Sequence, residues 1–205
     1  MDATSTRVPG DPGEAGGRRG VFLIVGDKVI LRALEREDLA RSYRWMNDPQ
    51  IVRTLKSRYP MPLEEEEGWL ERAISPSSRE RHFAIERKDS RTHIGNASLH
   101  GIDWVSRTAW FGLFIGEPAA WNAGFGSDSI RSLVRFSFEE MNLGKLRINV
   151  FDYNERGKHV LAGLGFVQEG KLEREFYREG SYHDIVIYSI FRDGPERGAL
   201  EDENE

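Results

Sequence analysis

Apolar and polar residues recur along the chain with two different periods. Seven stretches alternate between apolar and polar residues or form short apolar runs, which predicts strands over 28–34, 82–88, 93–103, 108–115, 145–151, 166–177 and 182–191. Four stretches repeat at helical spacing, which predicts helices over 35–48, 63–74, 127–142 and 155–164. Because helices do not follow strands one for one, the order favours a single α+β domain with a largely antiparallel sheet over a doubly wound fold.

Both ends of the chain lack these periods. Residues 1–20 are rich in Gly, Pro, Ser, Thr and charge, and residues 194–205 are acidic. We expect a flexible arm at each end of one domain that spans residues 21–193. The first twenty residues contain no apolar segment of the kind that a secretory signal needs.

Composition narrows the class of protein. The chain has 205 residues, of which 39% are hydrophobic and 31% charged, an ordinary globular balance. It has no cysteine, which excludes disulfides and thiolate nucleophiles and favours a cytoplasmic location. A net charge of −5 argues against nucleic acid as a partner. No apolar run approaches the ~20 residues that cross a bilayer, so we expect no membrane partner.

The sequence WNAGFGSDSI, residues 121–130, joins a predicted strand to a predicted helix and contains Gly124 and Gly126. The first N–H groups of a helix lack partners and carry partial positive charge, so glycines there allow a phosphate to approach. The alternative is a tight loop capped by Ser127, and Asp128 would repel a phosphate if it pointed inward. The P-loop and the Rossmann fingerprint are excluded, since they need a lysine or a third glycine that is absent here.

Four segments in order resemble one family. They are VILRALEREDLARSYRWMNDPQI (29–51), WNAGFGSDSI (121–130), NERGKHVLAGLGF (154–166) and FYREGSYHDIVIYSI (176–190). They resemble the GCN5-related N-acetyltransferases (GNAT), and within them the ribosomal-protein-alanine and spermidine N-acetyltransferase branch. The resemblance covers about residues 27–192. It implies a GNAT fold, with a mixed, mostly antiparallel twisted sheet of about six to seven strands and about four helices.

The resemblance also implies where acetyl-CoA binds. The strand that ends at Phe114 and Ile115 would splay from the strand that ends at Val150, and pantetheine would pair with the Phe114 and Ile115 backbone. Asn154 would hydrogen-bond the pantetheine arm, and Lys158 would either meet phosphate or be a solvated lysine. The pyrophosphate would be wrapped by backbone N–H groups of Trp121, Asn122, Ala123, Gly124, Phe125, Gly126 and Ser127.

The sequence leaves alternatives for the general acid and for the general base. Many family members carry a tyrosine that protonates the leaving thiolate, but this chain has Leu161 there, and Tyr153 is the candidate substitute. Candidates for the base that deprotonates the amine are His100, Asp103 and Asp184. A structural role is the alternative for each of them, and a chain of ordered water would serve equally well.

The function that follows is direct transfer of acetyl from acetyl-CoA to a primary amine, without a metal. The acceptor would be a protein N-terminal α-amine, a polyamine or another small amine, and the resemblance is compatible with a homodimer. The alternative is a non-catalytic acetyl-CoA-binding sensor or interaction module, which the missing tyrosine favours. The acidic run PLEEEEGWL, residues 62–70, either attracts a basic acceptor or is a solvated helix face.

Overall fold

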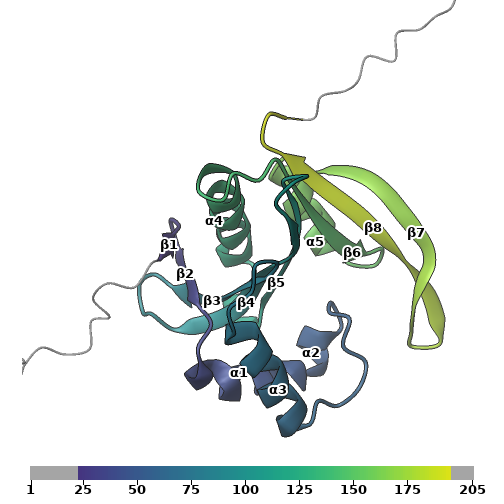
Figure 1. The fold of residues 1–205 in the computed structure, drawn as a ribbon. Coiled ribbons are helices and arrows are strands. Elements are labelled where there is room, and N and C mark those ends of the chain that lie inside the picture. Colours follow the sequence, from purple (N-terminus) through teal and green to yellow (C-terminus); the bar gives the residue numbers. More distant parts are fainter. Residues whose placement is uncertain (1–22, 195–205) are drawn as a thin grey trace, which may run out of the picture.

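The computed structural model describes residues 23–194 and is built on one eight-stranded sheet in the order β1-β2-β3-β4-β5-β6-β8-β7 (Figure 1). Neighbouring strands are antiparallel except β5 and β6, which are parallel. The strands are β1 (Ile24–Val25), β2 (Val29–Ala33), β3 (Arg81–Arg87), β4 (His93–Asp103), β5 (Thr108–Ile115), β6 (Lys145–Phe151), β7 (Val167–Arg178) and β8 (Ser181–Phe191). The predicted arms, 1–20 and 194–205, lie outside the described residues apart from residue 194.

Helices cover both faces of this sheet. Figure 1 shows α4 against one face and α1, α2 and α3 gathered against the other. The α-helices are α1 (Leu39–Met46), α2 (Pro49–Val52), α3 (Leu63–Ile74), α4 (Phe125–Glu139) and α5 (Glu155–Gly163), and two 3₁₀ turns are η1 (Arg36–Asp38) and η2 (Pro118–Ala120). The predicted α+β architecture is confirmed. The sequence missed β1 and α2, because elements of two and four residues are too short to show a period.

The main core lies between the sheet and α4. Leu133 of α4 is buried against Leu31, Phe111 and Leu146, which come from three different strands. A smaller cluster on the other face packs Leu70 of α3 against the sheet. Each face of the sheet therefore has its own apolar cluster, and β5 lies in the sheet between the two clusters.

A buried ionic network ties η1 to the sheet. Arg32 donates two hydrogen bonds of 2.7 Å to Asp38 and one of 2.6 Å to Glu86. Burial alone would raise the pKa of Asp38, but the Arg32 bonds and nearby His93 outweigh it and hold that pKa well below its usual range. This network fixes where α1 begins beneath the central strands.

The sheet opens between β5 and β6. These strands pair only through Thr108–Trp110 and Lys145–Arg147, although β5 continues to Ile115 and β6 to Phe151. Beyond Trp110, β5 has β4 as its neighbour on one side and no strand on the other among the described residues. This is the splay that the family resemblance implies. Within residues 23–194, no helix is long and apolar enough to cross a membrane.

Candidate active site

The space where β5 and β6 part is a hollow of about 360 Å³, which we call the β5–β6 cleft. One wall is formed by Leu113, Phe114 and Ile115 of β5, and the other by Ile148, Asn149 and Val150 of β6. Its lining also includes Gln50, Ile51, Arg53, Thr54, Trp121, Gly126, Asn154, Arg156, Gly157 and Leu161. The predicted Phe114, Ile115, Trp121, Gly126 and Asn154 are therefore brought together.

The loop before α4 presents a row of free donors beside this cleft. Gly124 adopts φ +84°, a left-handed conformation that favours glycine, and α4 begins at Phe125, two residues earlier than predicted. The first N–H of this helix region with an acceptor is that of Asp128, which donates to the Gly124 carbonyl at 3.0 Å. Among residues 23–194, no acceptor is bonded to the six backbone N–H groups of Asn122, Ala123, Gly124, Phe125, Gly126 and Ser127. Such a run of donors at a helix N-terminus suits an anion.

Asp128 does not oppose an anion at this loop. Its buried carboxylate accepts backbone N–H bonds from Lys28 at 2.8 Å, Val29 at 3.1 Å and Asp27 at 3.3 Å. It therefore anchors α4 to the turn between β1 and β2. Ser127 makes no side-chain cap, since the cap position belongs to Gly124.

Two polar side chains at the cleft have partners within the protein. The indole N–H of Trp121 donates to the Ile115 carbonyl at 2.8 Å, so one of the two predicted pantetheine-pairing residues already has its carbonyl bonded. The amide oxygen of Asn154 accepts the Gly157 N–H at 3.0 Å and caps α5. Among residues 23–194, no acceptor is bonded to the amide nitrogen of Asn154, which leaves that donor for a ligand.

Among the cations that line the cleft is Arg156, which the sequence analysis did not single out, whereas it named Lys158. Lys158 Nζ is held by the Asp152 carbonyl and the Glu155 carboxylate, each at 2.7 Å, and does not line the cleft. Arg156 does line it, with its guanidinium carbon 5.4 Å from the Trp121 ring centroid. A cation in the first turn of a helix opposes the helix dipole, so the position of Arg156 is not explained by stabilisation of α5.

A second hollow, of about 230 Å³, lies at the point where β5 and β6 begin to part. His100 lines it together with Trp110, Asn149 and Lys56. His100 as a whole residue is exposed, yet desolvation by the surrounding protein lowers its pKa, with Glu80 acting in the opposite direction. Of the four predicted catalytic candidates, His100 lines this hollow, whereas Asp103, Tyr153 and Asp184 line neither it nor the β5–β6 cleft.

Asp103 and Asp184 make local bonds away from these hollows. Asp103 accepts the Ser106 and Val105 N–H groups at 2.9 Å and closes the turn after β4, and these bonds lower its pKa. Asp184 accepts the Arg174 N–H at 2.8 Å, where the pairing of β7 and β8 is irregular, and its pKa is lowered too. Both contacts favour the structural alternative.

Tyr153 and Leu161 are the two positions considered for the general acid that protonates the leaving thiolate. The Tyr153 hydroxyl donates to the Arg53 carbonyl at 2.8 Å, its ring stacks on Phe151, and burial raises its pKa. Leu161 is buried in the core and contributes one apolar side chain to the β5–β6 cleft. The position of the family tyrosine is therefore apolar here, and the nearest candidate substitute is engaged elsewhere.

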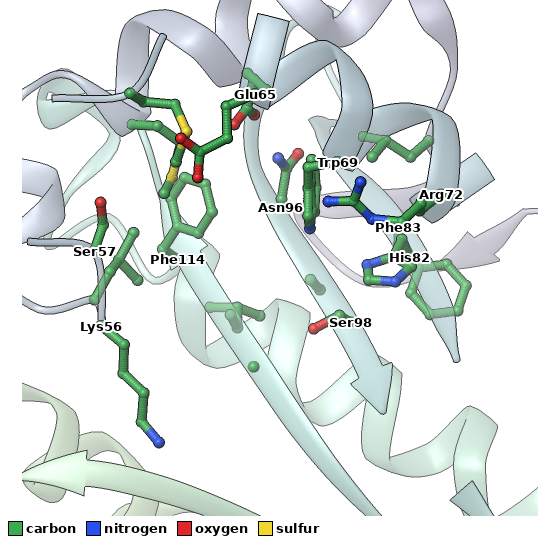
Figure 2. Close-up of a pocket in the computed structure, with 18 residues that line it drawn as sticks. Lys56, Ser57, Glu65, Trp69, Arg72, His82, Phe83, Asn96, Ser98 and Phe114 are labelled. Carbon is green, nitrogen blue, oxygen red and sulfur yellow. The ribbon is translucent and has the colours of Figure 1, made fainter. Parts of the chain in front are cut away.

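A third hollow, of about 490 Å³, lies between α3 and the central strands, and we call it the α3 pocket (Figure 2). Its lining is largely apolar and includes Trp69 and Phe114, while Gly112, Leu113 and Phe114 of β5 form a wall that it shares with the hollows described above. Figure 2 shows Glu65, Trp69, Asn96 and Phe114 around this space. Two other tryptophans lie outside this pocket: Trp45 is a core residue and Trp104 is exposed.

The glutamates of the acidic run lie on different sides of α3. Glu64 and Glu67 are exposed and lie outside the pocket lining, whereas Glu65 and Glu66 line it. Glu66 is only 2% exposed, and burial raises its pKa to about 7, with neighbouring Glu65 adding to the effect. The run therefore has two glutamates on the exposed side of α3 and two that line the pocket.

Comparison with known proteins identifies the family. The model of the acetyltransferase (GNAT) domain matches residues 28–167. The chain belongs to the GNAT family. It is an N-acetyltransferase of this family, whose members use acetyl-CoA.

Individual GNAT relatives agree with this assignment. The chain is 30% identical over 161 residues to spermidine N(1)-acetyltransferase from Vibrio cholerae, covering 78% of this chain and 91% of that protein. It is 34% identical over 98 residues to the putative ribosomal N-acetyltransferase YdaF of Bacillus subtilis, covering 48% and 53%. A crystal structure of the Vibrio cholerae spermidine enzyme in complex with CoA and spermine matches with a TM-score of 0.74 at 30% identity, covering 81% and 96%.

Proposed function

We propose that this GNAT enzyme transfers acetyl directly from acetyl-CoA, bound in the β5–β6 cleft, to a primary amine that enters through the α3 pocket. The observation that carries the proposal is the run of six N–H groups, 122–127, that have no acceptor within residues 23–194. Donors in this number suit a pyrophosphate, and the opening between β5 and β6 beside them suits an extended arm. The CoA bound by the Vibrio cholerae relative supports the same ligand class.

Different residues of the chain would bind different parts of acetyl-CoA. The loop 121–127 would bind the pyrophosphate through its backbone, and Arg156 would supply positive charge in place of the expected Lys158. The free edge of β5 at Phe114 and Ile115 would take the pantetheine arm, and the amide nitrogen of Asn154 would donate to it. Because the Trp121 indole already occupies the Ile115 carbonyl, the N–H of Ile115 would be the backbone group of that residue left for the arm.

Acetyl-CoA supplies the thioester, and the protein's task is to align the amine with it and to manage protons. The amine nitrogen bonds to the carbonyl carbon as the carbon–sulfur bond breaks, and no bond to the enzyme is needed. Backbone N–H groups near Phe114 and Ile115 would stabilise the oxyanion. His100 is the favoured proton acceptor, because its lowered pKa keeps the imidazole neutral and it lines the hollow where β5 and β6 part. The leaving thiolate would be protonated by solvent, since Leu161 is apolar and the Tyr153 hydroxyl is engaged.

The three hollows share a lining residue of β5, and this supports the proposal that the acceptor amine enters from the α3 side. Leu113 lines the α3 pocket and both cleft hollows, so a ligand on each side would approach the same strand. The two named relatives point to a polyamine and to an α-amine of a ribosomal protein as the first acceptors to test. A homodimer and a cytoplasmic location remain expectations, the latter from the absence of cysteine.

Calorimetry with acetyl-CoA, followed by thiol release against a panel of amines, tests this proposal. The panel holds spermidine, small monoamines and peptides with free α-amino ends. Binding followed by thiol release with one class of amine is the expected result. Binding without turnover on any amine would favour the non-catalytic sensor, and absence of binding would mean that the loop 121–127 is only a tight turn.

A further inference from the structure

Four carboxylates are buried among residues 23–194, and three of them have evident partners. Asp38 is bonded twice by Arg32, Glu86 by Arg32 and Arg91, and Asp128 by three backbone N–H groups. The fourth is Glu66, which is 2% exposed and has no hydrogen bond or ion pair to its side chain from any described residue. A buried carboxylate without a partner is costly, so this one calls for an explanation.

Glu66 lines the α3 pocket, so its carboxylate borders a space large enough for a ligand. The other buried polar side chain of that lining is Asn96, and it is already satisfied. Its amide oxygen lies 2.8 Å from His93 Nε2 and its amide nitrogen donates to Ser42 Oγ at 3.1 Å. The pocket thus offers an entering molecule one carboxyl group without a protein partner, in a lining that also includes apolar side chains such as Trp69, Phe114 and Met61.

The remaining charged or titratable groups of the pocket come from three elements. Glu65 lies beside Glu66 on α3 and adds negative charge, while Lys56 precedes that helix, Arg72 follows on it and His82 lies on β3. Figure 2 shows Lys56 directed away from Glu65, and Arg72 and His82 grouped beyond Trp69 in that view. Among residues 23–194, neither Lys56, Arg72 nor His82 pairs with Glu66, so the Glu65–Glu66 end of the pocket keeps its negative character.

We propose that Glu66 binds the ammonium group of the acceptor, and that the preferred acceptor is a primary amine carried on an apolar body. The inference rests on the proposed acetyltransferase function and adds the residue and the chemistry that select the acceptor. An ammonium would give the Glu66 carboxylate its missing partner, and the apolar lining would receive the rest of the molecule. The raised pKa of Glu66 agrees with this, because binding a cation there would favour the ionised form and strengthen as the pH rises from 6 to 8.

Direct binding of two molecules of similar shape and opposite charge tests this without turnover. Phenethylamine and 3-phenylpropionate are titrated by calorimetry into the full chain without acetyl-CoA, in wild type, Glu66→Gln and Glu67→Gln. Glu67 is the matched control, since it is an exposed glutamate next to Glu66 on the same helix and outside the pocket lining. We expect wild type and Glu67→Gln to prefer the amine, and Glu66→Gln to lose about tenfold or more in amine affinity, as expected for a charge-assisted bond. Glu66→Asp, which keeps the charge on a shorter side chain, should retain part of the preference.

Equal amine affinity in wild type and Glu66→Gln, or no preference for the amine in wild type, would overturn the inference. Acetyl-CoA titrated into the same three proteins separates this from failure of the proposed function. Unchanged acetyl-CoA binding with an unchanged amine preference refutes the role of Glu66 alone, whereas loss of acetyl-CoA binding in wild type refutes the cleft assignment. In turnover, Glu66→Gln should raise the KM for the amine and leave the KM for acetyl-CoA unchanged, a split that a purely structural role would not give.

Discussion

Replacing Glu66 by glutamine should stabilise the protein at pH 8 far more than at pH 5. Glutamine has nearly the shape of the protonated acid but cannot ionise. Burial raises the pKa of the Glu66 carboxyl from 4.5 to about 7, so the folded protein holds a proton that the unfolded chain releases between those values. The contribution of Glu66 to stability is therefore fully present below pH 4.5 and is lost as the pH rises through about 7.

The size of the effect follows from the pKa shift. Each pKa unit corresponds to about 1.4 kcal/mol, so ionised Glu66 lowers the free energy of unfolding by roughly 3 kcal/mol at pH 8 and by less than about 1 kcal/mol at pH 5. The side chain is 2% exposed, so solvent screening does not remove this penalty. Glutamine itself adds a cost of burying an amide, but that cost does not change with pH.

Urea unfolding at a series of pH values between 5 and 8 measures this difference. Wild type, Glu66→Gln and the exposed control Glu67→Gln are compared at each pH, so that titration of Glu65, His82 and the other groups cancels between proteins. The gain in unfolding free energy of Glu66→Gln over wild type should grow from pH 5 to about pH 7 and then level off, while Glu67→Gln stays flat. Parallel curves for Glu66→Gln and wild type would show that the carboxylate is solvated or paired, and would remove the basis for its role in binding.

Three further predictions concern the cleft. A Cβ at position 126 would make only ordinary contact, 3.8 Å from Ile115 Cγ1, so Gly126→Leu should fold and gain about 0.8 kcal/mol of helix propensity. It should nevertheless abolish acetyl-CoA binding in calorimetry, because position 126 lines the cleft. Gly163→Leu, at an open helical position outside the cleft, should bind acetyl-CoA normally. Asn154→Ala should cost about 1 kcal/mol of stability through loss of the α5 cap and weaken acetyl-CoA binding, whereas Asn154→Ser should keep the cap and still weaken binding in the same titration. His100→Gln should remove the acidic limb of the kcat/KM–pH profile, and a profile that keeps this limb would assign proton acceptance to water.

The sequence predicted the long elements well because their periods are unambiguous. The bounds of α3, β4, β5 and β6 match the predictions, and the errors elsewhere are one to four residues at element ends. The start of α4 was placed two residues late because Ser127 was read as the cap. A left-handed glycine at the cap position leaves no mark in the sequence that distinguishes Gly124 from any other loop glycine.

The binding loop was predictable because it is one continuous segment, whereas side-chain direction was not. Lys158 and Arg156 stand two residues apart on α5, and only the structure separates the one bonded to Glu155 from the one that lines the cleft. The burial of Glu66 could not be predicted from the sequence for the same reason. Four consecutive glutamates look alike in sequence, and the turn of α3 decides which one is buried.

The parting of β5 and β6 explains how ligands on the two sides of the sheet can meet. Side chains of consecutive strand residues point to opposite faces, so a strand enclosed on both edges separates what lies on each face. After Trp110, β5 has no neighbouring strand on its β6 side within residues 23–194, and Leu113 and Phe114 line both the β5–β6 cleft and the α3 pocket. The same loss of pairing therefore frees backbone groups for a thioester arm and opens a passage for an amine held at Glu66. A substitution that closed this edge should abolish transfer even where each ligand still binds by itself.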